Sequence, residues 1–189
     1  MADYTRVKKY TGILFSGLPG SGKTTTSRQL AEKLGWPIFY VGGIRREEWS
    51  HKYPNGEVTF EDFIRSISVD EEREMEKRAH DALAQGGIIG DMWHGIIGDG
   101  LPILRVFITA PLEVRAERGI KTDKKEISGK TLEEVKALLN DREGRQLALA
   151  KKIYGDWYDY RDPAGYHLTL NSGLLSVEEK ISSVLHFFE

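Results

Sequence analysis

The feature that most constrains the fold is the segment Gly17–Thr24, GLPGSGKT, which matches the phosphate-loop pattern G-x-x-x-x-G-K-[ST] at every position. The apolar run 13–15 precedes it. Residues 25–34 have the composition of a helix, which Gly35 and Pro37 would end. A strand, a glycine-rich loop and a helix in this order predict that the loop backbone binds phosphate.

This loop predicts the binding site for the phosphates of a nucleotide. Its glycines can adopt dihedral angles that side chains forbid, so consecutive N–H groups can point at one anion, and the helix adds the positive end of its dipole. We expect Lys23 to reach the β- and γ-phosphates and the Thr24 hydroxyl to bind Mg²⁺. The expected cofactors are ATP and Mg²⁺. The expected donor-site residues are Gly17, Pro19, Gly20, Ser21, Gly22, Lys23, Thr24 and Thr25.

Composition excludes several other classes of function. The 189 residues suit one domain, and 27 basic against 29 acidic residues leave no excess positive charge for a nucleic acid polymer. The absence of cysteine excludes a disulfide scaffold, a thiolate metal site and a cysteine nucleophile. No apolar run of about twenty residues occurs, and the first residues lack the apolar core of a signal peptide. We therefore expect a cytoplasmic monomer without membrane contact.

Further apolar runs alternate with helical segments along the chain. Strands are predicted at 38–41, 86–91, 103–108 and 166–171, and helices from Thr59, at 68–84, 112–118 and 132–153, and after Ser176. The charged run Asp70–Arg78 is interpreted as a solvent-exposed helix face. Five strands alternating with helices predict an α/β protein with a parallel sheet covered on both faces, a three-layer P-loop sandwich.

Charged residues follow two of these strands, at the edge where α/β sheets bind ligands. Asp91 ends the third strand and is either a ligand of Mg²⁺ or the cap of the next segment. Arg45 and Arg46 follow the second strand, and they either bind an anion or form a solvated pair balanced by the next two glutamates. Trp93 and His94 are candidates for lining a pocket, although such residues are more often structural.

One arginine falls on the apolar face of a helix. In the helix predicted at 132–153, Arg142 and Gln146 lie within the apolar stripe and Arg145 at its margin. An inward-facing arginine costs free energy unless it meets an anion. Arg142 is therefore either paired with a buried carboxylate or directed at a phosphate.

Together these motifs resemble the nucleoside monophosphate kinases, most of all the cytidylate kinase and cytidylate-kinase-like group. The resemblance covers almost the whole chain, at 15–24, 41–47, 109–118, 142–143, 154–156 and 166–171. It implies a single P-loop kinase domain over 1–189 with strand order 2-3-1-4-5. It also implies a helical monophosphate-binding insert at about 43–85 and a lid at about 116–130. Taken alone, the polar run 121–126 is either such a flap or only a loop.

The resemblance implies roles for several residues. Arg46 matches the arginine that meets the acceptor phosphate, Arg118 a lid arginine that bridges donor and acceptor, and Arg142 an arginine after the lid. With Lys23 and Asp91 they would form the catalytic group. No residue of such enzymes forms a covalent intermediate, because the cations act by stabilising charge on the transferred phosphoryl group.

The acceptor side departs from the family pattern. Met92 and Trp93 stand where the family has glycine and arginine, and Gln146 and Leu149 stand where it has the aspartate and arginine that read cytosine. A second lid arginine near Thr122 is missing, and Lys121 and Lys124 are candidate replacements. The expected acceptor-side residues are Arg46, Gly42, Trp93, Gln146 and Arg145.

Three functions remain open at this point. The first is ATP-dependent phosphorylation of a nucleoside monophosphate, with CMP or dCMP favoured by the resemblance. The second is phosphorylation of another small-molecule acceptor, which the altered acceptor side suggests. The third is a nucleotide-binding regulatory protein without catalysis. The retained lysine and arginines argue against the third, because an inactive site has no need of inward-facing cations.

Overall fold

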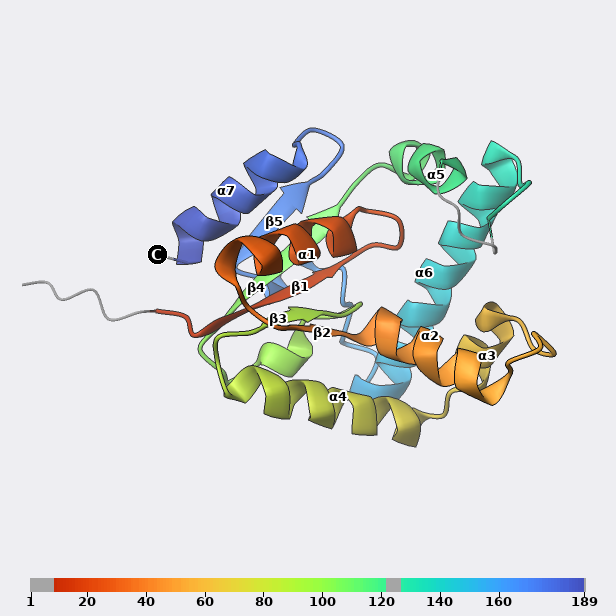
Figure 1. The fold of residues 1–189 in the computed structure, drawn as a ribbon, viewed down its shortest axis with the longest axis horizontal. Coiled ribbons are helices and arrows are strands. Elements are labelled where there is room, and N and C mark those ends of the chain that lie inside the picture. The colour runs from red at the N-terminus through yellow and green to blue at the C-terminus, as the bar shows by residue number, and fades with distance from the viewer. Residues whose placement is uncertain (1–8, 122–126, 189) are drawn as a thin grey trace, which may run out of the picture.

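A computed structural model describes residues 9–121 and 127–188 of the chain (Figure 1). Its centre is a five-stranded sheet of order β2-β3-β1-β4-β5, in which every pair is parallel. The strands are β1 (Gly12–Gly17), β2 (Ile38–Tyr40), β3 (Ile89–Asp91), β4 (Ile103–Thr109) and β5 (Leu168–Asn171). The predicted fold class and strand order are therefore confirmed.

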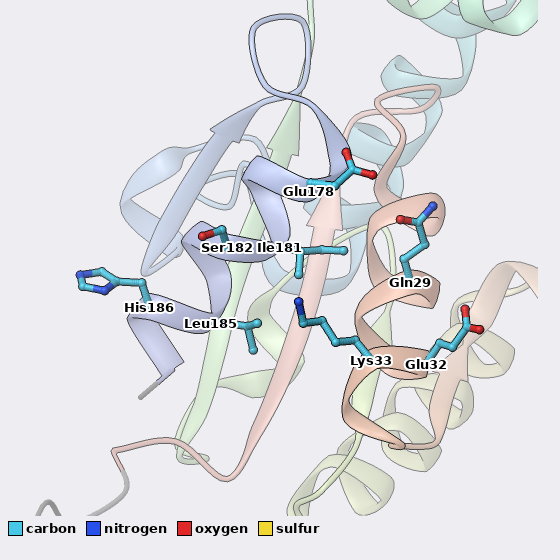
Figure 2. Close-up of a pocket in the computed structure, with 8 residues that line it drawn as sticks. All are labelled: Gln29, Glu32, Lys33, Glu178, Ile181, Ser182, Leu185 and His186. Atoms are coloured by element: carbon cyan, nitrogen blue, oxygen red, sulfur yellow. The ribbon is translucent and has the colours of Figure 1, made fainter.

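One face of the sheet is covered by α1 (Lys23–Leu34) and α7 (Val177–Phe188), which lie side by side (Figures 1 and 2). Leu30 of α1 and Val184 of α7 are fully buried against Ile13 and Phe15 of β1. Successive residues of a strand point to opposite faces, so β1 can supply both cores. The result is one apolar layer beneath α1 and α7.

The opposite face is covered by α4 (Val69–Ala84) and by the short 3-10 helix η1 (Ile96–Gly98). Leu14, between the two residues that face α1, packs here against Met75 and Leu83 of α4. Ser68 and Glu71 cap α4 reciprocally, since each side chain accepts a hydrogen bond from the other's backbone N–H. The two faces together make the three-layer sandwich.

Four further helices lie toward the carboxyl ends of the strands (Figure 1). These are α2 (Val41–Lys52), α3 (Phe60–Ser66), α5 (Leu112–Ile120) and α6 (Leu132–Tyr154). A second 3-10 helix, η2 (Pro163–Gly165), precedes β5. Thr59 caps α3 and Thr131 caps α6. Val135, Leu139 and Ala150 of the predicted stripe are buried, so α6 packs inward along most of its length.

Some boundaries differ from those predicted. Val41, expected to end the second strand, begins α2 instead, and β5 starts at Leu168 rather than at Tyr166. The expected lid at 116–130 includes Thr122 and Lys124, which lie outside the described residues. Within the described ranges, no helix combines the length and the apolar character needed to cross a membrane.

A hollow of about 730 Å³ lies between the later turns of α1 and α7, where Figure 2 shows Gln29 and Lys33 across from Ile181 and Leu185. Lys33 stands ten residues after Lys23, a distance of about 15 Å along a helix axis. This hollow is therefore separate from the phosphate loop.

We predict opposite stability effects for alanine at two glycines. A methyl group at Gly17 would lie 2.2 Å from the carbonyl oxygen of Ile108, so β1 and β4 would have to separate locally. Gly17→Ala should lower the free energy of unfolding by about 2 kcal/mol. The control is Gly144→Ala on the exposed side of α6, where a methyl group meets nothing within 4 Å. It should raise that free energy by about 1 kcal/mol. Urea denaturation measures both, and equal effects would contradict the register of β1 with β4.

Candidate active site

The phosphate loop connects β1 to α1 and leaves backbone N–H groups for an anion. Gly20 and Gly22 have φ of 79° and 82°, the left-handed region that side chains disfavour. No side chain caps α1, whose N-cap is Gly22. The first N–H groups of a helix have no partner within it. A loop of this shape in front of an uncapped helix fits the phosphates of a nucleotide.

Arg115 of α5 holds the loop in place from beneath. Its side chain is 5% exposed, Nε donates to the carbonyl of Ala110 at 3.0 Å, and Nη1 donates to the carbonyl of Pro19 at 3.1 Å. Nη1 also lies 3.2 Å from Oε2 of Glu143 on α6. One guanidinium therefore joins the phosphate loop to α5 and α6. Arg115 stands within the quoted 109–118 segment and can share a helix face with Arg118, but no role was predicted for it.

Asp91 lies fully buried at the carboxyl end of β3, as the sequence predicted for an acid beside the phosphate loop. The Lys23 ammonium pairs with one of its oxygens, and Ser27 Oγ donates to the other at 2.9 Å. Ser27 was missed, although it stands one helical turn after Lys23 and therefore on the same face of α1. Thr24 is partly exposed in the first turn of the same helix.

Arg118 reaches the loop from the last turn of α5. Its Nη1 and Nη2 donate to Oγ and to the carbonyl of Ser172 at 2.8 and 2.6 Å. Ser172 Oγ in turn donates to the carbonyl of Ser21 at 2.6 Å. Arg118 Nη1 also lies 3.8 Å from the position that a Cβ at Gly22 would occupy. The structure thus brings Arg118 to the phosphate loop.

On the acceptor side, α2 and α3 are joined through Arg46. Its Nη1 donates to the carbonyl of Gly42 at 3.2 Å, and its guanidinium lies 4.3 Å from the ring centre of Phe60. Arg145 of α6 pairs with Glu61 of α3 at 2.7 Å and with Asp141 at 3.0 Å. These two carboxylates already engage its guanidinium and tie α3 to α6. Arg142, on the same helix, is partly exposed.

Trp93 and Gln146 are brought together by a residue that the sequence analysis did not name. Tyr160 is 1% exposed, its ring centre lies 5.3 Å from that of Trp93, and its hydroxyl donates to Gln146 Oε1 at 3.2 Å. Trp93 Nε1 donates to Glu72 Oε1 at 2.8 Å. Burial raises the pKa of the Tyr160 hydroxyl above its usual value, so this group remains a hydrogen-bond donor at neutral pH.

The charged run Asp70–Arg78 is not wholly solvent-exposed, and the interpretation is wrong for Glu72. This side chain is buried at 5% exposure, and its Oε2 accepts from Arg45 Nη2 at 3.1 Å. Arg45 is buried as well and pairs with Glu48 at 2.9 Å. It is therefore neither solvated nor directed at a ligand, because a buried arginine needs carboxylates of its own. The predicted anion-binding role is therefore wrong for Arg45 and stays a prediction for Arg46.

Within the described residues, the group Glu72, Glu76 and His94 has the composition of a metal site, with ligand atoms within 4.8 Å of one another. Both oxygens of Glu72 already accept hydrogen bonds, from Arg45 and from Trp93. The remaining pair, His94 Nε2 and Glu76 Oε1, lies 3.1 Å apart. Glu72 therefore belongs to a buried polar network that fixes Trp93, while Glu76 Oε1 and both ring nitrogens of His94 are buried without a hydrogen-bond partner in the described part of the chain.

Comparison with known proteins identifies relatives over most of the chain. Residues 13–174 match the model of the cytidylate kinase-like family. A cytidylate kinase of Methanopyrus kandleri is 33% identical over 183 residues, which cover 90% of this chain and 89% of that protein.

Solved structures of kinases share the fold at lower identity. Shikimate kinase from Acinetobacter baumannii, in complex with shikimate, has a TM-score of 0.57 and 18% identity over 95% of this chain and 93% of that chain. A gluconokinase from Sinorhizobium meliloti has a TM-score of 0.58 and 14% identity over 97% of this chain and 95% of that one. At such identities, the likeness establishes the P-loop kinase fold alone.

We predict that Arg115→Met destabilises the protein by about 3 kcal/mol, because it leaves the Pro19 carbonyl without this donor and removes a partner of the partly buried Glu143. Arg73→Met on the exposed face of α4 is the matched control and should change stability by less than about 0.5 kcal/mol. Urea denaturation followed by circular dichroism measures both. Equal stability of the two variants would show that Arg115 does not hold the loop.

Proposed function

Because the chain belongs to the cytidylate kinase-like family, we propose that it transfers a phosphoryl group from ATP to a nucleoside monophosphate, with CMP or dCMP favoured. The observation that carries this proposal is the uncapped start of α1, with Lys23 and Asp91 at the same place. Phosphoryl transfer needs little covalent chemistry from the protein, and its demands are position and positive charge. The fixed phosphate loop and the lysine beside it support the proposal on both counts.

The donor's phosphates would bind the N–H groups of the loop and the ammonium of Lys23. Arg118 reaches the same loop through Ser172 and would add charge where the transferred group passes. Arg142 of α6 is the further cation proposed for this task. Such fixed charges act most strongly on the transition state, because the protein has already oriented them before reaction.

Thr24 and Asp91 would hold Mg²⁺, with Asp91 available once the Lys23 ammonium turns from its carboxylate to the phosphates. A hydroxyl and a carboxylate are hard oxygen ligands of the kind this ion prefers. When bound, Mg²⁺ neutralises charge on the phosphates and orients them. The Lys23 ammonium pairs with Asp91 in this structure, and Ser27 holds the second oxygen of the same carboxylate. Ser27 thus fixes the direction in which Asp91 points.

On the acceptor side, Arg46 would bind the phosphate, and Trp93 and Gln146 would contact the base. The oxygen of Gln146 accepts from Tyr160, so the amide offers its N–H₂ group to a ligand. A cytosine ring presents acceptors at N3 and O2 and can pair with such a donor. Gly42 supports this side as the partner of Arg46, and Arg145 supports it by holding α3 against α6.

Phosphorylation of another small metabolite is the second candidate, and a specific observation favours it. Trp93 replaces an arginine of the family pattern and is committed to Glu72 through its ring nitrogen. One positive charge is therefore missing from the acceptor side. An acceptor less charged than a nucleoside monophosphate would suit that change.

The test is ADP release from the purified protein with Mg-ATP against CMP, dCMP, UMP, AMP, GMP, dTMP and buffer alone. We expect CMP or dCMP to stimulate release. Stimulation by another monophosphate would confirm a nucleoside monophosphate kinase but contradict the preference for CMP or dCMP. Stimulation by none, with ATP binding intact, would overturn the nucleotide acceptor and favour the second candidate or a protein without catalysis.

We predict that Lys23→Ala lowers kcat/KM at least about 100-fold, because a charge on the transferred group loses its partner. Lys33→Ala is the matched control, since Lys33 is an exposed lysine at the other end of the same helix. It should keep full activity. Unchanged turnover in Lys23→Ala would refute the assignment as a kinase.

A further inference from the structure

A buried lysine of α7 points at the phosphate loop. Lys180 is 2% exposed, and its Nζ lies 3.9 Å from the position that a Cβ at Gly22 would occupy. Arg118 Nη1 lies 3.8 Å from the same position. Two cations from two different helices therefore approach the glycine that starts α1. The phosphate-loop pattern does not include Lys180, which lies 157 positions after Lys23 in a separate part of the chain.

No carboxylate in residues 9–121 and 127–188 pairs with the Lys180 ammonium. Among the described residues, no carboxylate lies within ion-pair distance of Lys180 Nζ, and no protein atom is recorded as its hydrogen-bond partner. Burial lowers the pKa of Lys180, and the charge of Arg118 lowers it further, against a smaller opposite effect from Glu178. A buried charge without a partner costs free energy. The arrangement is thus relieved by an anion at Gly22.

Packing and hydrogen bonds position the part of α7 that carries Lys180. The next residue, Ile181, is buried in the core between α7 and α1 and is drawn pointing toward α1 in Figure 2. Ser172 fixes the connection between β5 and α7 to the loop, through its hydrogen bond to the Ser21 carbonyl. Ser21 Oγ is itself buried without a partner. Lys180 is therefore placed before any ligand arrives.

We propose that Lys180 binds the phosphate donor. Together with Arg118, it would contact the phosphates of ATP beside the phosphate loop. The proposal deepens the function proposed above and rests on it for the identity of the donor. Its ligand chemistry is the polyphosphate, so the contact depends on the phosphates and not on the adenosine.

The test measures binding of ATP, ADP, AMP and adenosine to the full-length protein by calorimetry, without an acceptor. K180M should weaken ATP and ADP binding about tenfold and leave adenosine binding unchanged, as expected for one charge-assisted contact. K180R, which keeps the charge, should bind ATP within about threefold of the original chain. K152M, on an exposed position of α6, is the matched control and should bind as the original does.

Two binding results would overturn the proposal. One is ATP binding by K180M equal to that of the original chain, and the other is equal loss for ATP and adenosine, which would indicate a merely structural role. K180M should also unfold no earlier than the original chain without nucleotide, because it removes a buried unpaired charge. A K180M variant that fails to fold would also overturn the proposal, because it would show that Lys180 is needed for the structure itself. Because binding is measured without acceptor, a negative acceptor panel would refute the proposed function and leave this inference standing.

Discussion

The structure depends on the backbone polar groups of the phosphate loop, whose carbonyl groups and N–H groups have different partners. Donors within the protein bind the carbonyl groups of the loop. The Ser21 N–H donates to the Leu18 carbonyl and the Arg115 guanidinium to that of Pro19. The Ser172 hydroxyl donates to the Ser21 carbonyl and the Thr26 hydroxyl to that of Gly22. Donors from β5–α7, α5 and α1 thus hold the outer side of the loop. The N–H groups at the start of α1 lack a capping side chain and are left for an anion. The loop is therefore rigid before a nucleotide binds, which avoids paying its ordering entropy on binding.

Arginines close together in the sequence differ in burial. The buried ones stabilise the fold, and the more exposed ones are the candidates for binding a ligand. Arg45 and Arg115 are buried, and each meets a carboxylate and at least one backbone carbonyl, so they brace α4 and the phosphate loop. Arg46 and Arg118 are more exposed. Arg118 donates to two oxygens of Ser172, and Arg46 donates to the Gly42 carbonyl and lies over the ring of Phe60. A guanidinium that is accessible at the surface of a site can bind a phosphate oxygen, whereas a buried one cannot reach a ligand. This contrast supports the site roles of the second pair.

Much of this could be predicted from the sequence, because the signals are local. The phosphate loop, the apolar strands, the Thr59 cap and the acid at Asp91 are each encoded within a few residues. Glu72 could not be read correctly, since its partners Arg45 and Trp93 stand 27 and 21 positions away and the surrounding run is charged. Lys180 was missed for a similar reason. It occupies a helix turn that looks solvated until α7 docks on α1.

In the proposed acceptor site, the residues that would contact the base are different from the residue that would contact the phosphate. Trp93 and Tyr160 direct their polar atoms to Glu72 and Gln146, so these rings are fixed by the protein itself. Rings held this way can stack on a base, and the amide of Gln146 can pair with its edge. In the proposed site, Arg46 would supply the positive charge that meets the acceptor phosphate. Replacing arginine by tryptophan would then cost electrostatic attraction but not base recognition, because stacking and neutral hydrogen bonds need no charge at that position.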